Sequence, residues 1–332
     1  MQEKTIKSIL HHKLDDWLSS ITDNPSLVDL IRRDAMVTGG AITSLLTGAE
    51  PNDFDFYFKT KETTEAVARY YVKKFKLNPP SRFKSGAGKT VDIQVLSTDH
   101  RVKIVVKSQG IAGESGVDNY QYFEQPGVDP SEPQEFVENV VKDKEDAEKS
   151  SGKNGSKDSS KDGSTNKSKY RPVFLTSNAI SLSDKIQIII RFFGPIETIH
   201  ENYDFVHCTC SWDAATGDLS LPHAALVSII NRRLKYKASK YPLCSIIRTR
   251  KFLKLGWHID AGQYVKMGWD LHKLDLSNIE VLEDQMVGVD SAYFMEVIGM
   301  LRQRDEEVIK KGEDVKPIDA SYLMEVIDKV FG

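Results

Sequence analysis

The stretch VTGGAITSLLTGAEPNDFDFYF, residues 37–58, holds a strand, a glycine turn, a helix and a second strand in close succession. A short apolar strand over residues 36–38 runs into Gly39-Gly40, and apolar residues at helical spacing follow until Gly48, a residue type suited to end a helix. Phenylalanines then alternate with polar residues, which is the period of a strand. This order predicts that the glycine turn and the second strand belong to one α+β unit.

The glycine turn has the features of a phosphate site. A helix N-terminus offers free backbone N–H groups and a partial positive charge, and glycine lets a phosphate approach the backbone closely. Gly39 and Gly40 stand at the point where the strand ends and the helix begins. The sequence therefore predicts a phosphate-binding bend there.

Two carboxylates follow on the second strand. Asp53 and Asp55 stand at positions i and i+2, so alternation places both on one face, while Phe54 and Phe56 point the other way into the core. Two neighbouring carboxylates repel each other unless a cation lies between them. Mg²⁺ suits such a site, because it accepts few protein ligands and takes the rest from water and phosphates. We therefore predict that Asp53 and Asp55 bind Mg²⁺ or Mn²⁺.

Hydrophobic periodicity predicts further elements outside this stretch. The predicted helices cover residues 3–21, 24–33, 61–76 and 195–202. The predicted strands cover residues 91–96 and 102–107, a hairpin over 180–193 that turns at Ser183-Asp184, and residues 204–212. The pattern from Pro222 onward is mostly helical. We expect an α+β fold, with a mixed sheet and flanking helices over residues 1–220 and an all-α domain over 221–332.

A polar insertion interrupts the first of these domains. Residues 142–169 contain a single apolar residue, Ala147. Such a segment cannot bury enough surface to offset its ordering entropy, so we predict that it is disordered. A surface insertion between two strands is compatible with a single domain.

Composition excludes several classes of protein. The chain has 332 residues, 28% of them charged, and a net charge of −3, which excludes a globally basic nucleic-acid coat. Three cysteines exclude a disulfide scaffold and fit a reducing compartment, so we expect a cytoplasmic protein. No apolar run approaches the roughly 20 residues needed to span a bilayer, and no membrane partner is expected.

The cysteines near residue 210 do not have the spacing of a strong metal motif. Cys208 and Cys210 form a C-x-C pair beside His207, without the paired C-x-x-C spacing of zinc sites. On the strand predicted here, both cysteines share one face and the histidine takes the other. We expect these cysteines to serve core packing.

The glycine turn and the aspartates together resemble the nucleotidyltransferase superfamily of the polymerase-β type. The closer resemblance is to class II tRNA nucleotidyltransferases and bacterial poly(A) polymerases, whose pattern G-G-x-V-R-D-x-L-L-G followed by P-x-D-x-D appears here as GGAITSLLTG and PNDFD, residues 39–55. Thr43 and Ser44 replace the family's arginine and aspartate. The resemblance implies a nucleotidyltransferase-type sheet in which Gly39 and Gly40, with Thr43 or Ser44, hold the triphosphate.

A second stretch resembles the family's R-R-D-F-T-I-N-A-L-x-x-D. Here NYDFVHCT, residues 202–209, retains the Asp-Phe pair but replaces both arginines. The resemblance implies that Asp204 lies beside the nucleotide, as a third acidic residue that completes the metal site or orients the acceptor hydroxyl. Gln187 and Asp92 are the competing positions, since many members of the superfamily carry the third carboxylate on a strand next to the Asp-x-Asp strand.

A third stretch resembles the helical part of the family. SIINRRLKY (228–236) and SIIRTRKFLKLGWHID (245–260) place Arg232 or Arg233, Arg248 and Lys251 on nucleotide-binding positions. The family's E-D-x-x-R, which reads the incoming base, would fall on YPLCS, residues 241–245, where nothing matches. Residues 231–254 also hold nine Lys or Arg and no acid, which suits a triphosphate or an RNA backbone.

The resemblance implies a template-independent nucleotidyltransferase that transfers a nucleotide from a nucleoside triphosphate to an acceptor, with an RNA 3′ hydroxyl as the expected acceptor. Three alternatives remain open. The chain could nucleotidylate a protein or tRNA as a toxin does, could bind RNA or nucleotide without catalysis, or could be an assembly component. The divergent motifs and compact size favour a phage or mobile-element protein, which would act in a host cytoplasm.

Overall fold

The computed structural model describes residues 1–78, 92–107, 169–176, 178–278 and 318–331, with isolated residues between 281 and 311. The predicted disordered insertion lies outside the described residues, apart from Lys169. The described chain divides into two units. Unit 1 contains residues up to 200 together with 208–222, and unit 2 contains residues 201–207 and those from 223 onward. The expected domain boundary at residue 220 stays a prediction.

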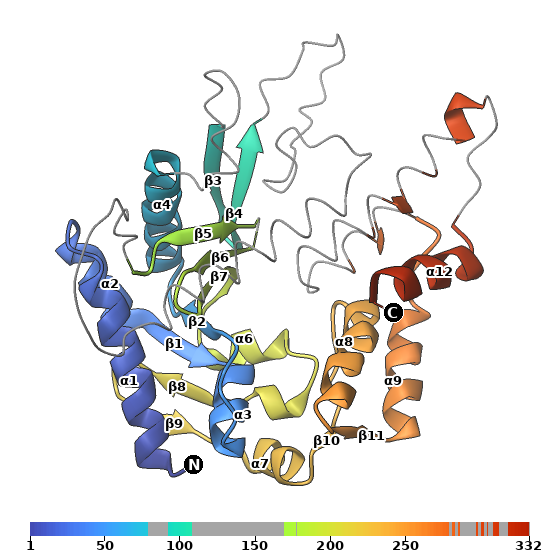
Figure 1. Cartoon of the computed structure of the whole chain (residues 1–332), viewed down its shortest axis with the longest axis horizontal. Coiled ribbons are helices and arrows are strands. Elements are labelled where there is room, and N and C mark those ends of the chain that lie inside the picture. Colours follow the sequence, from blue (N-terminus) through green and yellow to red (C-terminus); the bar gives the residue numbers. More distant parts are fainter. Residues whose placement is uncertain are drawn as a thin grey trace, which may run out of the picture. The chain divides into compact units, whose positions relative to one another are not determined.

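Unit 1 is built on a seven-stranded mixed sheet in the order β5-β6-β7-β2-β1-β8-β9 (Figure 1). Its strands are β1 (Ala35–Thr38), β2 (Phe54–Phe58), β5 (Pro172–Leu175), β6 (Ala179–Leu182), β7 (Ile186–Phe193), β8 (Ser211–Asp213) and β9 (Leu219–Ser220). β2 and β7 pair in parallel, and the other neighbours in this sheet are antiparallel. The predicted mixed sheet is therefore present, with the predicted hairpin as β6 and β7.

Helices cover one face of this sheet. They are α1 (Glu3–Ser19), α2 (Pro25–Asp34), α3 (Gly40–Thr47) and α4 (Lys61–Leu77). The short α6 (Ile196–Glu201) follows β7 and contacts Thr38 of β1 through His200. Trp17 of α1 packs its ring 4.9 Å from that of Phe56 and donates a hydrogen bond of 2.6 Å to the Tyr71 hydroxyl of α4. Phe56 is fully buried, so this face forms the core, and the predicted inward orientation of the strand's phenylalanines is confirmed.

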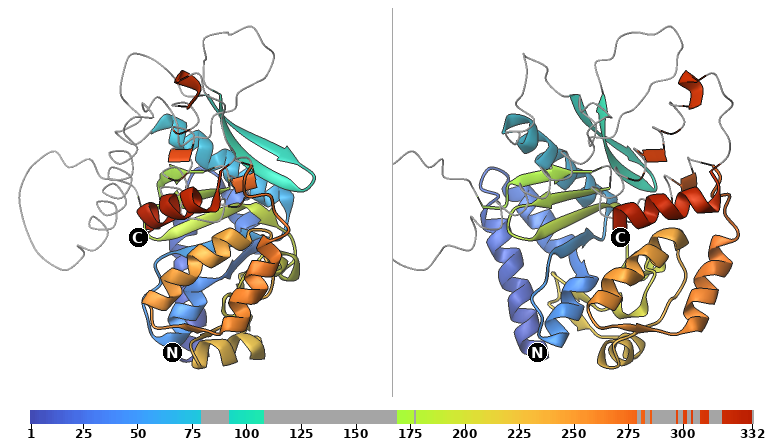
Figure 2. Two further views of the ribbon diagram at one scale, coloured as in Figure 1. Left: turned by 90° about the vertical axis from the view of Figure 1, so that its right-hand side faces the viewer. Right: turned by 45° about the vertical axis from the view of Figure 1, so that its right-hand side comes forward.

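The predicted strands near residue 100 form a sheet of their own. β3 (Asp92–Thr98) and β4 (Arg101–Lys107) pair only with each other among the described strands. Figure 2 shows them as a hairpin in teal, distinct from the seven-stranded sheet. Asp92 is consequently not on a strand next to β2.

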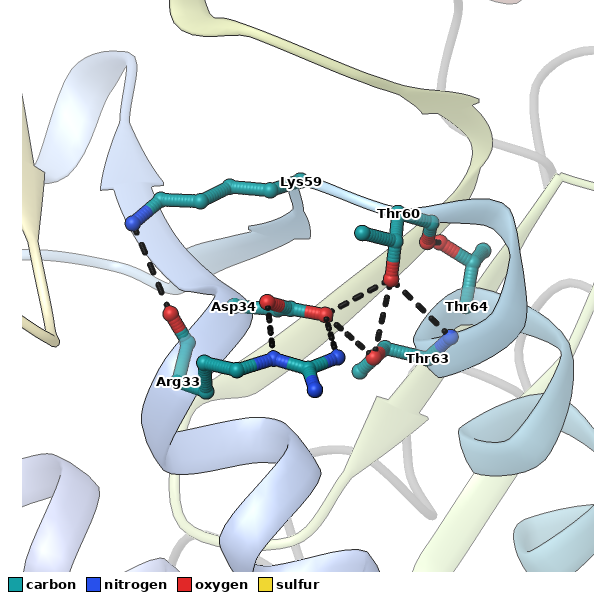
Figure 3. Close-up of polar contacts among 6 residues, drawn as sticks. All are labelled: Arg33, Asp34, Lys59, Thr60, Thr63 and Thr64. Carbon is teal, nitrogen blue, oxygen red and sulfur yellow. Dashed lines mark hydrogen bonds and ion pairs between the residues drawn. The ribbon is translucent and has the colours of Figure 1, made fainter.

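Asp34 joins three elements at the start of β1 (Figure 3). Its carboxylate accepts bonds of 2.8 Å from Arg33 Nε and Nη2, 2.6 Å from the Thr60 hydroxyl and 2.5 Å from the Thr63 hydroxyl. Its backbone carbonyl accepts the Lys59 N–H at 3.0 Å. These bonds tie the end of α2 to the N-terminus of α4, where Thr60 is the cap.

Unit 2 contains α7 (His223–Ile230), α8 (Pro242–Lys254), α9 (Ala261–Leu271) and α12 (Ala320–Phe331). It also contains two short parallel strands, β10 (Arg233–Leu234) and β11 (His258–Ile259), which the expectation of an all-α domain omitted. α8 and α9 lie side by side (Figures 1 and 2). A second hydrophobic cluster around Leu243 gives this unit its own core.

The predicted strand over residues 204–212 is wrong for most of its length. Val206–Cys208 form a turn of 3₁₀ helix, and only Ser211–Asp213 are a strand. The two cysteines and His207 therefore do not alternate between the faces of a strand. All three are buried, as expected for core packing.

No helix in the described part of the chain is long and apolar enough to cross a membrane.

Candidate functional site

The bend at Gly39 is held in a conformation that favours glycine. Gly39 has φ 96° and ψ −148°, a region that residues with a side chain rarely adopt, and it caps the N-terminus of α3. Its N–H donates to the Cys208 carbonyl at 3.1 Å. Gly40 is exposed, and an added Cβ would meet no atom within 4 Å. The space in front of the first turn of α3 is therefore open to a ligand.

A buried hydroxyl fixes the residue before the bend. Thr38 is fully buried, and its Oγ1 lies 2.8 Å from the Cys210 carbonyl and 2.8 Å from His200 Nε2. The carbonyl can only accept, so the single hydroxyl proton goes to it, and His200 must donate to Thr38. The predicted bend is thus set by the carbonyls of Cys208 and Cys210, with His200 as a further anchor.

The sheet register brings the bend next to the aspartates. β1 and β2 are antiparallel, with Val37 opposite Phe56. One step further along this register, Thr38 stands opposite Asp55, and the glycines follow beside the start of β2. Opposite residues of antiparallel strands have Cα atoms about 4.5–5.5 Å apart. The structure therefore places Gly39, Gly40 and Asp55 at the same end of neighbouring strands.

The two aspartates differ in their local structure. Asp55 lies within β2, whereas Asp53 directly precedes the strand, whose pairing starts where the Phe54 N–H donates to the Lys185 carbonyl at 2.8 Å. The expectation that both aspartates belong to a strand is correct for Asp55 alone. Both side chains are half-buried. Because Phe56 faces Trp17, alternation points Asp55 to the opposite face.

The strand on the other side of Asp55 carries an amide. Gln187 of β7 is the register partner of Asp55 and is half-buried. Of the competing positions for a third acid, this is the one on a strand adjacent to β2.

The donor set fits a magnesium ion that arrives with phosphate ligands. No group of three His, Cys, Asp or Glu side chains that could hold a metal occurs among the described residues. Two half-buried carboxylates, Asp53 and Asp55, are nevertheless enough for Mg²⁺, which keeps several waters and commonly takes one or two protein carboxylates together with substrate phosphates. A cation held by these two carboxylates would take its remaining ligands from water or from phosphate oxygens.

Thr43 and Ser44 lie on α3, directly after the glycines. Thr43 is buried and Ser44 is half-buried, and the carbonyls of both accept the Thr47 hydroxyl at 3.0 Å. The sequence-predicted residues of unit 1 are thus gathered at the bend after β1, on α3 and at the start of β2.

The remaining predicted residues belong to unit 2. Asp204 is 4% exposed and forms an ion pair of 2.9 Å with Arg248 of α8. The Asp204 carbonyl also accepts the Lys237 N–H at 2.8 Å. The carboxylate predicted as a third acid is therefore already paired with a guanidinium within its own unit.

Buried aromatic rings surround the segment that carries Asp204. His207 packs 4.4 Å from Trp257 and 4.7 Å from Phe252, measured between ring centroids. Burial, and secondly the charge of Arg248, lowers the pKa of His207 to about 3. This histidine is therefore neutral at physiological pH and belongs to the core of unit 2.

Arg232 and Lys251 are both exposed. Arg232 has φ 47° and follows α7, and its carbonyl accepts the His258 N–H at 2.7 Å. Lys251 lies in the last turn of α8. A cavity of about 410 Å³ in unit 2 contains none of the predicted site residues, and its charged lining residues are Glu201, Lys240, Asp270 and Lys273.

Sequence reasoning missed Thr38 and His200. No local motif links them, because 162 positions separate them in the chain. The one signal in the sequence was a threonine directly before a glycine turn.

The chain is similar to proteins described as anti-defense proteins. A family model described as Gabija anti-defense 2 family protein matches residues 8–232. The protein "Gabija anti-defense 2" of Bacillus phage SPbetaL7 is 24% identical over 152 residues, which cover 44% of this chain. The match spans 38% of that relative's length, which is less than half of it.

Solved structures similar to this chain include CCA-adding enzymes. The Thermotoga maritima enzyme complexed with tRNA is 12% identical with a TM-score of 0.34, and the match covers 90% of this chain and 54% of that one. The Bacillus stearothermophilus enzyme in complex with CTP is also 12% identical with a TM-score of 0.34, over 84% and 51%.

The family model spans α2, α3 and α4, the glycine bend, both aspartates and Gln187, and it covers more than half of the chain. The protein belongs to the Gabija anti-defense 2 family.

Proposed function

We propose that this protein is a nucleotidyltransferase that transfers a nucleotide from a nucleoside triphosphate to an acceptor without a template. The observation that carries the proposal is the register of β1 and β2, which sets a glycine bend at a helix N-terminus beside Asp55. A phosphate-binding bend that follows one strand, with metal-binding carboxylates on the neighbouring strand, suits a triphosphate and its cation. Membership in an anti-defense family suggests that the product helps a phage overcome host defence.

The candidate site residues of unit 1 each have a role in this reaction. The backbone N–H groups at the start of α3 bind phosphate oxygens, because they lack partners within the helix and lie at its positive end. Asp53 and Asp55 hold the cation, and Thr38 with His200 keeps the bend in place. When bound, Mg²⁺ neutralises phosphate charge and lowers the pKa of the acceptor hydroxyl.

The transfer exchanges a phosphoanhydride bond of the triphosphate for a phosphodiester bond to the acceptor. The acceptor hydroxyl attacks the α-phosphorus and loses its proton to water, a new P–O bond forms, and the bond to the bridging oxygen of pyrophosphate breaks. An in-line transfer of this kind depends mainly on positioning and charge stabilisation. An RNA 3′ hydroxyl is the acceptor that we propose.

The residues of unit 2 complete the proposal. Within unit 2, Arg232, Arg248 and Lys251 would supply positive charge to the phosphates of a nucleotide or of RNA. Asp204 would act by holding the Arg248 guanidinium, with which it pairs at 2.9 Å.

A panel of α-labelled ATP, CTP, GTP and UTP, incubated with total host RNA and Mg²⁺ or Mn²⁺, tests the activity on a denaturing gel. The wild-type protein should label RNA, and Asp53→Asn with Asp55→Asn should abolish labelling. Asp29→Asn, which changes an exposed aspartate on α2, is the control and should label RNA as the wild type does. Labelling that survives the double substitution would contradict the proposal.

A second acceptor class follows from the family. Because the relatives act against a defence system, the acceptor could be a host protein, and a labelled lysate separated on a protein gel distinguishes this case. Label in a protein band that requires Asp53 and Asp55 would support protein nucleotidylation. Nucleotide binding without any labelled product would support a binding protein that has lost catalysis.

A further inference from the structure

A neutral amide occupies the position beside Asp55 on the adjacent strand. Gln187 is the register partner of Asp55 in the parallel pair of β7 and β2, and register partners share a face of the sheet. Neighbouring strands lie about 4.8 Å apart. Both side chains are half-buried. The amide and the carboxylate therefore reach the same region above the sheet.

Local structure fixes the direction of the Gln187 side chain. Its neighbours Ile186 and Ile188 are 1% and 0% exposed and face the core. Alternation along β7 then directs Gln187 to the face that carries Asp55 and Thr38. A rotation of β7 that buried Gln187 would expose both isoleucines to solvent.

The amide is available to a ligand. Among the residues that the structure describes, none forms a hydrogen bond or ion pair with the Gln187 side chain, a property that distinguishes it from Asp55 and Thr38 on the same face. A half-buried amide has two N–H donors and one carbonyl acceptor to satisfy. An oxygen-rich ligand placed over Asp55 would meet these donors.

The charge of this position affects the substrate and the cation in opposite ways. A carboxylate here would strengthen cation binding but repel the phosphates of a nucleotide. An amide contributes no charge and can donate to a phosphate oxygen. The site then depends on the nucleotide to supply the remaining ligands of the cation.

We propose that Gln187 is a substrate-contacting residue that donates its amide N–H to a phosphate oxygen of the nucleotide, and that its neutrality makes cation binding depend on the nucleotide. The inference rests on the proposed function. Gln187 lies on the strand next to β2, where a third carboxylate was one of the expectations. The inference gives this position a role in substrate binding instead.

Two variants and a matched control test this role of Gln187 in binding assays, which need no catalytic turnover. The readouts are the affinity for Mn²⁺ alone, from the electron paramagnetic resonance signal of free Mn²⁺, and the affinity for α,β-methylene analogues of the four nucleoside triphosphates in Mn²⁺, from calorimetry. Gln187→Ala should weaken analogue binding about tenfold, as expected when a hydrogen bond to a charged group is removed, and leave Mn²⁺ binding unchanged. Gln187→Glu should tighten Mn²⁺ binding and weaken analogue binding.

Ser220→Glu is the control for an added charge. Ser220 is exposed on β9 and pairs with Ser211, which in turn pairs with Thr38, so it lies on the same face but about 14 Å from Asp55 at the usual strand spacing. This variant should bind Mn²⁺ and the analogues as the wild type does.

The outcomes separate this inference from the proposed function. If the wild type binds analogue and labels RNA, but Gln187→Ala binds analogue equally well or Gln187→Glu leaves Mn²⁺ affinity unchanged, the role of Gln187 is wrong and the proposed function stands. If the wild type neither binds an analogue nor labels an acceptor, the proposed function fails and this inference fails with it. Melting curves of all variants establish that they are folded.

Discussion

At the start of β1, the buried carboxylate of Asp34 accepts hydrogen bonds from Arg33, Thr60 and Thr63. The bonds from Arg33, followed by those of the two threonines, hold the pKa of Asp34 well below its usual range despite burial. A carboxylate with so many donors is costly to replace, because the donors are left without their charged partner.

We expect Asp34→Asn to lower the free energy of unfolding at pH 7 by about 2–3 kcal/mol, measured by urea denaturation. Because the folded pKa lies below the unfolded one, the contribution of Asp34 is present above about pH 4 and is lost as the pH falls further. Asp29→Asn, an exposed change on the same helix, should shift the midpoint little. Equal stability of both variants would contradict the role of Asp34.

His207 also makes the stability depend on pH, but here the cause is burial of the imidazole and not hydrogen bonding. The pKa of His207 is about 3 in the folded protein, which is below its value in the unfolded chain. Between about pH 6.5 and pH 3 the unfolded chain therefore binds a proton at His207 that the folded protein does not bind. The free energy of unfolding consequently falls as the pH drops through this range. At pH 5 this decrease amounts to about 2 kcal/mol. In His207→Phe, urea denaturation at pH 7 and pH 5 should show a smaller decrease than in the wild type. An identical decrease would show that His207 is protonated without cost.

At the scale of the elements, the bend between β1 and α3 contains two adjacent glycines that differ in the backbone conformation they adopt. Gly39 needs a backbone conformation that disfavours side chains, and Gly40 does not. Gly39→Ala should therefore cost about 1–3 kcal/mol of stability in urea denaturation. Gly40→Ala should fold as stably as the wild type but place its methyl group where the nucleotide is proposed to lie.

Binding of α,β-methylene nucleotide analogues, measured by calorimetry, should weaken in Gly40→Ala. Because the variant keeps its fold, weaker binding would report on the ligand alone. Unchanged binding would place the triphosphate elsewhere and would leave the bend as a structural turn.

The elements of unit 1 were largely predictable, because each one has a clear local pattern. Alternating phenylalanines indicated β2, and Gly48 marked the end of α3 with φ 78°. The segment 204–212 was mispredicted because its apolar, β-branched and cysteine residues suit a strand, whereas the carbonyls of Cys208 and Cys210 turn toward Gly39 and Thr38. That requirement comes from tertiary packing, which no local pattern shows.

At the scale of the whole molecule, the charge is unevenly distributed. The net charge is −3, yet residues 231–254 contain nine basic residues and no acid. Arg233 and Arg248 form ion pairs with Asp260 and Asp204. Four exposed lysines of this stretch have no carboxylate partner among the described residues: Lys235, Lys240, Lys251 and Lys254.

If RNA is the acceptor, these lysines should contribute to its binding through release of counterions. Replacing the four by glutamine should weaken RNA binding and reduce the slope of log affinity against log salt by about one for each phosphate that is no longer neutralised, measured by fluorescence anisotropy at low and at physiological salt. An unchanged slope would remove this surface from the acceptor site. Replacing Lys4 and Lys73, outside this stretch, is the control.

The candidate site was predictable only in part. The glycine bend and the two aspartates are close in sequence and carry a motif, so their residue types pointed to phosphate and metal chemistry. The anchoring of Thr38 by His200 and the register of Gln187 with Asp55 depend on strand order, which the sequence left open. Strand order is set by long-range packing, and the residues that it brings together need share no local pattern.

A crystal structure of the protein with Mn²⁺ and an α,β-methylene nucleoside triphosphate tests the central claim most directly. We predict an anomalous peak for Mn²⁺ within coordination distance of the Asp53 and Asp55 carboxylates, and phosphate oxygens within hydrogen-bonding distance of the backbone N–H groups at Gly40 and Ala41. An ordered nucleotide whose phosphates and metal lie away from both aspartates and from this bend would contradict the account.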